Sequence, residues 1–335
     1  MLAVNESLPP NDQLNITEAR TIIEPGKNYD KYWDMDQLCE QLIGVLNIFE
    51  RMYPNCIGIF FFDQSSAHNA FADDALVATR MTVNGAGKNS KPMHDTFIPM
   101  DNPDPALRGM RQSMVYPPGH KDAGKLKGMR DVLEERGLLT TLTRGTRGQP
   151  VGICGACSQS EEARSKAEKA AREQMRSDPS FYRSLEDTGL DDDPPAQAVD
   201  RSSNCCMRRC LSLQQDFLNE KPRIQVMIEQ AGHRCIFLPK FHCELNPIEM
   251  YWGYAKRLFR EQSDGSITTA RKLVPECLNA ASITTIRHFW RKSWRYMDAY
   301  MNGLTGKQAE FAVKKFKSHR RVGKRVMMNI TSVLN

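Results

Sequence analysis

Apolar residues follow strand-like and helix-like patterns near both ends of the chain. The run Ile57–Phe62 is continuous and of strand length, which is typical of a strand buried on both faces. Between residues 34 and 53 the apolar side chains recur at helical spacing, and Pro54 ends that helix. A second strand is predicted at residues 234–239, and a helix begins near Pro247. This alternation of strands and helices favours an α/β fold.

Other segments have weaker patterns. Residues 84–150 are rich in glycine, proline and charge, and residues 179–204 have the polar composition of disordered chain. The remaining predictions are a short strand at 20–24, helices at 69–80 and 207–231, a charged solvent-facing helix at 159–178, and helices from 263 to about 320.

Composition excludes several classes of protein. The chain has 335 residues, 40% of them hydrophobic, which is enough for one sizeable core with additions or for two small domains. It contains no apolar run long enough to span a membrane and no signal-peptide pattern at its start. Ten cysteines without a secretory signal indicate free thiols or metal ligands in a reducing, intracellular compartment.

The positive charge is concentrated in the last part of the chain. From residue 251 to 335 there are 17 Lys and Arg against 5 Asp and Glu, a net +12 within a total of +6. This is the pattern expected for a DNA partner, although solvated helix faces are the alternative. The most basic segment is predicted to bind DNA phosphates or to act as a nuclear import signal, or else is a charged helix end. Its cations are Lys314, Lys315, Lys317, Arg320, Arg321, Lys324 and Arg325.

The aromatic residues just before that segment have a different interpretation. Trp290, Trp294 and Tyr296 lie at close spacing in a predicted helix. Aromatic side chains in this arrangement belong to a core more often than to a base-stacking surface. We therefore predict that all three are packing residues.

Two carboxylates stand at positions suited to chemistry. Asp63 follows directly after the predicted strand, at the edge of an open α/β sheet where ligands bind, and His68 is close in sequence. Glu249 falls in the first turn of the helix that starts at Pro247, after Asn246. Each has a structural alternative, since Asp63 can cap a following helix and Glu249 can close a capping box.

The motifs around these carboxylates resemble the mariner-type branch of the DDE transposases. The segment Asp63–His68 is similar to that family's second catalytic motif, with Gln64 where asparagine is usual. Residues 239–252 contain the proline, the Leu-Asn-Pro-Ile-Glu run and the tryptophan of the third motif. Residues 240–256 are also similar to a group of fungal transposase-like proteins, as are shorter stretches at 22–33, 87–89 and 317–323. The resemblance covers most of residues 18–325.

The resemblance implies a ribonuclease-H-like fold, in which helices flank a mixed five-stranded sheet. It also implies that three carboxylates hold two Mg²⁺ or Mn²⁺ ions about 3.5–4 Å apart for DNA cleavage and strand transfer. Asp63 and Glu249 match two of the three carboxylates, and His68 would lie near the metals or remain structural. The implied partner is DNA, with a homo-oligomer left open, and the implied location is the nucleus.

The third carboxylate of that family has no counterpart here. It belongs on the first strand of the sheet, whereas the similarity begins near Arg20, at what resembles the third strand. The polar residues before Arg20 offer no apolar run that could supply two strands. We therefore expect an incomplete sheet and weak or absent catalysis, as in an N-terminally truncated transposon relic or a late-called start.

The segment between the two carboxylates contains most of the remaining chemistry. Cys154 and Cys157 form a Cys-x-x-Cys knuckle, and Cys205 and Cys206 follow after the polar stretch. These four thiols predict a structural Zn²⁺ site, although Cys210 can replace one of the adjacent pair and unligated cysteines are the alternative. Zinc would tie together the two ends of the insertion.

These observations predict five segments and leave three functions open. The functions are a catalytically compromised DDE endonuclease, a non-catalytic nucleic-acid-binding protein derived from a transposon, and a zinc-stabilised interaction protein. The segments are a disordered N-terminus (1–18), the first part of the ribonuclease-H-like domain (19–87), an insertion with the cysteines (88–206), the second part of the domain (207–262) and a helical basic region (263–335).

Overall fold

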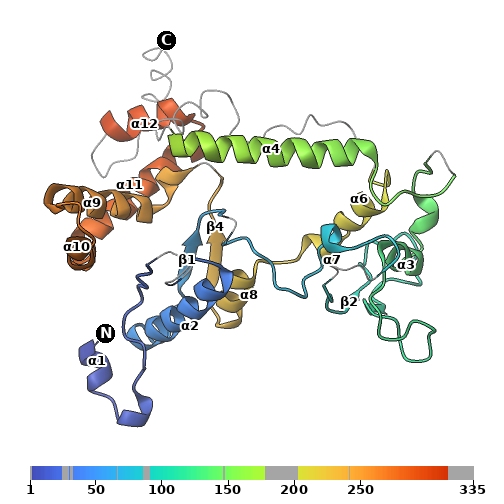
Figure 1. Ribbon diagram of the computed structural model, residues 1–335, viewed down its shortest axis with the longest axis horizontal. Coiled ribbons are helices and arrows are strands. Elements are labelled where there is room, and N and C mark those ends of the chain that lie inside the picture. The colour runs from blue at the N-terminus through green and yellow to red at the C-terminus, as the bar shows by residue number, and fades with distance from the viewer. Residues whose placement is uncertain are drawn as a thin grey trace. The chain divides into compact units, whose positions relative to one another are not determined.

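The chain is a mixed α/β protein, described here from a computed structural model (Figure 1). The structure describes residues 2–24, 30, 33–65, 67–85, 91–145, 148–177, 203–240 and 242–315. Contacts divide the chain into two compact units. Unit 1 comprises Met1–Gly58, Ser66–Ala170 and Ala196–Arg234, and unit 2 comprises Ile59–Ser65, Ala171–Pro195 and Cys235–Asn335. No helix in the described ranges has the length and apolar content to cross a membrane.

Unit 1 contains mostly short elements. Among its described residues, two-residue strands pair in antiparallel register, with Thr96 opposite Gln112 and Phe97 opposite Arg111, besides isolated bridges. Its elements are α1 (Leu2–Glu6), η1 (Pro10–Asp12), α2 (Met35–Met52), η2 (Ala78–Arg80), β2 (Thr96–Phe97), β3 (Arg111–Gln112), α3 (Met129–Glu135), η3 (Leu139–Thr141), α4 (Gly155–Ser177), α6 (Met207–Ser212), α7 (Gln215–Leu218) and α8 (Arg223–Gln230).

The long helix α2 matches its sequence pattern. Asp34 accepts a hydrogen bond from the Gln37 N–H at 3.0 Å, and the Gln37 side chain accepts one from the Asp34 N–H at 3.1 Å. This capping box satisfies two of the amides that a helix start leaves free. Leu38, Leu42 and Leu46 recur at intervals of four and are buried, so one face of the helix joins the core.

The strand predicted at residues 20–24 does not form. Local side chains take the backbone donors that a neighbouring strand would need: the Arg20 N–H donates to Glu18 at 3.1 Å, and the Glu24 N–H donates to Asp30 at 2.8 Å. Such local hydrogen bonds compete with sheet pairing. Ile22 is exposed, so no apolar face offsets the loss.

The helix predicted at 69–80 is also wrong, because only Ala78–Arg80 forms a single 3₁₀ turn. The Arg80 guanidinium donates to the Ala72 carbonyl at 2.8 Å and thereby fixes a turn. The segment predicted as one helix at 207–231 is divided into α6, α7 and α8. Pro222 precedes the first residue of α8, where it can donate no backbone hydrogen bond to a preceding turn.

The core of unit 1 lies where the apolar pattern was weakest. Val132 and Leu133 of α3 are fully buried, and Met207 and Leu211 of α6 pack in the same cluster. The cluster also takes side chains from turns and extended chain between residues 76 and 142. Beside it, Arg136 is fully buried and holds Asp216 through two hydrogen bonds of 2.9 and 2.6 Å.

Unit 2 is a small sheet with a group of helices (Figure 1). Its elements are β1 (Ile59–Phe62), β4 (Arg234–Phe237), η5 (Cys243–Leu245), α9 (Pro247–Gln262), α10 (Ile267–Asn279), α11 (Ile283–Met301) and α12 (Gly306–Lys315). The helices after residue 263 and the start of α9 at Pro247 agree with the prediction.

The strands β1 and β4 are neighbours and run parallel. The Arg234 N–H donates to the Gly58 carbonyl at 2.9 Å, and the Leu238 N–H donates to the Phe62 carbonyl at 2.8 Å. Both bonds join residues with the same separation in sequence, which is the register of a parallel pair. The expectation that β1 is buried on both faces is wrong, since Ile59 is 52% exposed. In the described residues β4 is its only neighbour, so much of its apolar surface stays uncovered.

The core of unit 2 forms where α11, α12 and the segment after β4 meet. Tyr296 and Ala299 of α11 pack with Ala309 and Ala312 of α12 and with Leu238. Trp290 contacts Phe61 of β1 edge to face, with ring centroids 5.3 Å apart. The prediction of a core position is therefore confirmed for Trp290 and Tyr296 but wrong for Trp294, which is 57% exposed.

Candidate metal centres

Asp63 lies at the carboxyl end of β1 and is half-buried. Its Oδ1 accepts a hydrogen bond from the Ser65 N–H at 3.1 Å, which folds the chain into a turn immediately after the strand. The described residues 64, 65 and 67–69 contain no helix, so Asp63 caps none there.

Glu249 lies in the first turn of α9, where the local sequence fixes the start of the helix. The Asn246 side chain accepts from the Ile248 N–H at 3.4 Å, and Pro247 occupies the first helical position. The Asn246 N–H donates to the Cys243 carbonyl at 3.1 Å and is not available to the Glu249 carboxylate. The capping-box alternative therefore does not hold, and the Glu249 side chain serves no cap.

Asp63 and Glu249 both belong to unit 2, and the charge of Asp63 acts on the Glu249 carboxyl group. Burial of its carboxyl group raises the pKa of Glu249, the Lys256 ammonium opposes this, and the charge of Asp63 raises the pKa further. Because Glu249 as a residue is exposed, solvent screens part of this repulsion. A bound divalent cation would relieve such like-charge repulsion between carboxylates.

The pair offers fewer ligands than a two-metal centre needs. In the described part of the chain, no third His, Cys, Asp or Glu joins Asp63 and Glu249 in a compact ligand group. His68 is half-buried in a turn at residues 67–69 and belongs to unit 1, not to the unit of the pair. The carboxylates therefore provide a partial site, which water or phosphate oxygens would have to complete.

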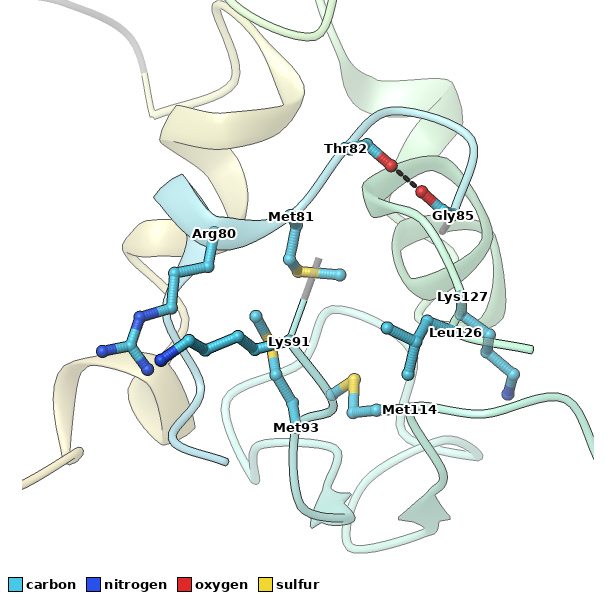
Figure 2. A pocket seen from close by; sticks show the side chains of 9 residues that line it. All are labelled: Arg80, Met81, Thr82, Gly85, Lys91, Met93, Met114, Leu126 and Lys127. Carbon is cyan, nitrogen blue, oxygen red and sulfur yellow. Dashed lines mark hydrogen bonds between the residues drawn. The ribbon is translucent and has the colours of Figure 1, made fainter. Parts of the chain in front are cut away.

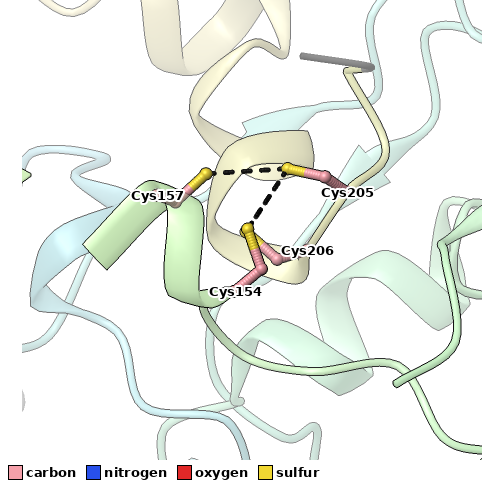
Figure 3. Close-up of side chains that lie close together, drawn as sticks. All are labelled: Cys154, Cys157, Cys205 and Cys206. Atoms are coloured by element: carbon pink, nitrogen blue, oxygen red, sulfur yellow. Dashed lines mark hydrogen bonds between the residues drawn. The ribbon is translucent and has the colours of Figure 1, made fainter. Parts of the chain in front are cut away.

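The four predicted cysteine ligands gather in unit 1 (Figure 3). Cys154 and Cys157 lie at the start of α4, and Cys205 and Cys206 immediately precede α6. All four sulfur atoms lie within 4.8 Å of one another. The Sγ atom of Cys205 is 3.7 Å from that of Cys154, 3.6 Å from that of Cys157 and 4.0 Å from that of Cys206. Four sulfurs bound to one tetrahedral Zn²⁺ lie about 3.8 Å apart, so the cluster matches that geometry.

Backbone contacts hold the two halves of the cluster in register. The Met207 N–H donates to the Val151 carbonyl and the Arg208 N–H to the Gly152 carbonyl, both at 3.0 Å. The Arg209 N–H points to the Cys206 sulfur at 3.5 Å. The segment before α4 and the start of α6 thus pair directly, although the chain between them is long. Cys210 lies instead in the hydrophobic core and does not replace a member of the cluster.

The thiols of the cluster differ in acidity. Burial raises the pKa of the Cys157 thiol, and burial together with the neighbouring thiols raises that of Cys205. Burial also acts to raise the pKa of Cys154, but hydrogen bonds from Cys157 and the other thiols lower it overall. Without a cation the cluster therefore resists full ionisation, and a metal that binds it must displace protons.

The pocket in Figure 2 is not a ligand site. It lies in unit 1 between Arg80, Met93, Met114 and Lys127, and its free volume is about 10 Å³, the space of a single water. Lys91 and Lys127 at its rim are paired with Asp73 and Glu135 at 2.5 and 2.6 Å. These cations stabilise the fold and leave no open anion site.

Of the basic segment, only two residues lie in the described structure, at the end of α12. Lys314 pairs with Glu310 at 2.6 Å, and the Lys315 ammonium lies 5.1 Å from the centre of the Phe311 ring. The other predicted DNA contacts lie outside the described residues, namely Lys317, Arg320, Arg321, Lys324 and Arg325.

A polar cluster next to the start of α9 was not predicted, because no local motif marks it. Glu244 Oε1 lies 2.7 Å from His242 Nδ1 and accepts from the Tyr300 hydroxyl at 2.9 Å. The Glu244 carbonyl accepts from Ser293, which is fully buried in α11, at 3.0 Å. This cluster anchors the segment between β4 and α9 to α11 and so fixes the position from which Glu249 projects.

Comparison of the chain with models of known families, with curated proteins and with solved structures gave no match.

Proposed function

We propose that the chain derives from a DDE-type transposase, with unit 2 as the remainder of a ribonuclease-H-like domain that bound DNA and divalent metal. One observation carries the proposal: Asp63 directly follows β1, and Glu249 lies in the first turn of α9, the helix after the neighbouring parallel strand β4, in the same unit. The carboxyl ends of parallel strands form the edge at which such sheets bind ligands. The charge of Asp63 also acts to raise the pKa of Glu249. The motif residues 239–252, which resemble the family's third catalytic motif, surround Glu249.

The same geometry supports loss of catalysis. Asp63 and Glu249 can hold one Mg²⁺ or Mn²⁺ ion together with water or phosphate oxygens. A two-metal centre needs a further carboxylate to hold both ions in place during an in-line displacement. Without it, the protein retains DNA binding in the nucleus and a weak metal site, but little or no endonuclease activity. A non-catalytic DNA-binding protein is the alternative that needs no metal.

The test combines Mn²⁺ binding, followed by electron paramagnetic resonance, with nicking of supercoiled DNA. We expect Mn²⁺ binding that is lost in Glu249→Gln and kept in Glu261→Gln, a matched variant at the exposed end of α9. We expect no nicking by any of the three proteins. Nicking that disappears only in Glu249→Gln would show that catalysis survives. Equal Mn²⁺ binding by all three proteins would remove the carboxylate pair from the proposal.

We also propose that the cysteine cluster of unit 1 holds a structural Zn²⁺ ion. The sulfur-to-sulfur distances support this, and four thiolates leave no open position for catalysis. Protein purified without added metal should contain one zinc per chain, and Co²⁺ in its place should give the absorption of a tetrahedral thiolate complex. Cys210→Ser should retain the metal and Cys157→Ser should lose it. Acidification should release it, because protons compete for the thiolates.

Zinc content measured together with DNA binding distinguishes a zinc-stabilised interaction protein from the two nucleic-acid-binding functions. A zinc-stabilised interaction protein without a nucleic-acid role would keep its zinc and bind no DNA even at low salt. Zinc together with salt-dependent DNA binding supports the transposase-derived protein.

A further inference from the structure

The exposed face of α11 carries basic side chains that form no ion pair with the residues that the structure describes. Arg287, His288, Arg291 and Lys292 are all exposed. None of the four forms an ion pair with any residue of the described chain, whereas Arg257 and Lys314 in the same unit pair with Glu261 and Glu310.

The helix geometry arranges these side chains on one side. Arg287, Arg291 and Trp294 are spaced by four and three residues, so they line one face over about 10 Å. His288 and Lys292 form the adjoining row. Ser293 and Tyr296, on the side of the helix away from Arg287, Arg291 and Trp294, are buried. Packing of the buried side of α11 therefore fixes which side of the helix faces solvent.

Trp294 provides an observation independent of charge. It is 57% exposed, although its neighbour Trp290 packs against Phe61. Large aromatic side chains are normally covered in a stable protein, and an exposed one beside unpaired cations is typical of surfaces that bind nucleic acid.

We propose that this face of α11, formed by Arg287, His288, Arg291, Lys292 and Trp294, binds the phosphate backbone of duplex DNA. The inference rests on the proposed function and names the surface that DNA would occupy. Unpaired arginines gain most from a polyanion, because each phosphate contact releases counterions and displaces no internal salt bridge. The rigid helix holds the cations in a line, which suits a duplex backbone. A site for single strands would require several stacking aromatics, and this face has one.

The test is the salt dependence of binding to a short fluorescent DNA duplex, measured by anisotropy between about 50 and 200 mM salt. Removing two phosphate contacts in Arg287→Gln/Arg291→Gln should weaken binding and reduce the slope of log K against log salt by about 2. The matched control is Arg111→Gln/Lys125→Gln, which removes two cations that unit 1 pairs with Asp95 and Asp122. It should leave the slope unchanged.

Further measurements make the proposal easy to reject. Trp294→Ala should weaken binding without changing the slope, because it removes no charge. The proposal fails if the double variant keeps the full slope, if the control lowers it equally, or if polyglutamate competes as well as DNA. Tighter binding to a single strand than to the duplex would also overturn it. If the protein binds DNA through this face but binds no Mn²⁺, only the metal proposal fails. The two outcomes are distinguishable because Glu249→Gln does not alter the basic face of α11.

Discussion

Two groups of cations, one in each unit, are used in opposite ways. In unit 1, Arg136 is buried and paired with Asp216 at 2.6 Å, and Lys127 is nearly buried and paired with Glu135 at 2.6 Å. In α11 of unit 2, Arg287, Arg291 and Lys292 face solvent and form no ion pair within the described residues. Arg136 and Lys127 are therefore part of the internal structure of unit 1, whereas the charge on α11 is available to a partner.

Their cores differ for a related reason. The core of unit 2 is formed by the apolar stripes of amphipathic helices such as α11. Each stripe follows from the helical spacing of apolar residues in the local sequence. Unit 1 collects its core from α3, α6 and intervening turns, with little regular structure to support it. The cysteine cluster and the Arg136–Asp216 pair supply long-range links that local hydrogen bonding does not. Removing either link should therefore lower the stability of unit 1 and leave that of unit 2 unchanged.

The largest effect should follow loss of the cysteine cluster. Cys157→Ser, or a strong zinc chelator, should destabilise unit 1 by several kcal/mol, since a structural Zn²⁺ contributes about 10–16 kcal/mol to the folding of small zinc domains. Hydrogen exchange should accelerate in α3 and α6 and remain slow in α11. Cys56→Ser, at an exposed cysteine, is the control and should change neither unit. Equal acceleration in both units would contradict the separation drawn here.

A smaller effect should follow loss of the buried ion pair. Arg136→Met leaves Asp216 without its partner and should cost about 3–5 kcal/mol in urea unfolding. The double variant Arg136→Met/Asp216→Leu should recover part of that loss, because no buried charge remains unpaired. Arg291→Gln on α11 should change stability by no more than about 0.5 kcal/mol. A comparable loss from Arg291→Gln would show that the α11 cations have a structural role.

The smallest effect concerns Glu249. Its raised folded-state pKa means that the folded protein binds this proton more tightly than the unfolded chain does. That contribution is complete below the ordinary carboxyl pKa of 4.5 and is lost as the pH rises through the higher folded value. At pH 7 without divalent metal, the melting temperature of Glu249→Gln should therefore be slightly higher than that of the natural protein. In acid the two melting temperatures should be equal. Mn²⁺ should raise the melting temperature of the natural protein only. A lower melting temperature of the variant at pH 7 would contradict the raised pKa of Glu249, which burial causes first and the charge of Asp63 second.

The local sequence pattern was sufficient to predict elements whose formation depends only on neighbouring residues. The capping residues and four-residue apolar spacing of α2, the apolar runs of β1 and β4, and Asn246-Pro247 at the start of α9 all act within a few residues. The knuckle spacing of Cys154 and Cys157 similarly predicted two members of the cysteine cluster from a separation of three residues. A single sequence is enough to detect such signals, because each depends on residues only a few positions apart.

Tertiary structure alone decided what depends on distant partners. It gathered Cys205 and Cys206 rather than Cys210 with the Cys154–Cys157 knuckle, buried Arg136 against Asp216, and left Trp294 exposed while Trp290 packed against Phe61. It also replaced two predicted elements, at residues 20–24 and 69–80, with irregular chain and turns in which side chains take part in the hydrogen bonding. Burial and charge pairing are set by residues far away along the chain, so a periodicity read over a dozen positions carries no information about them.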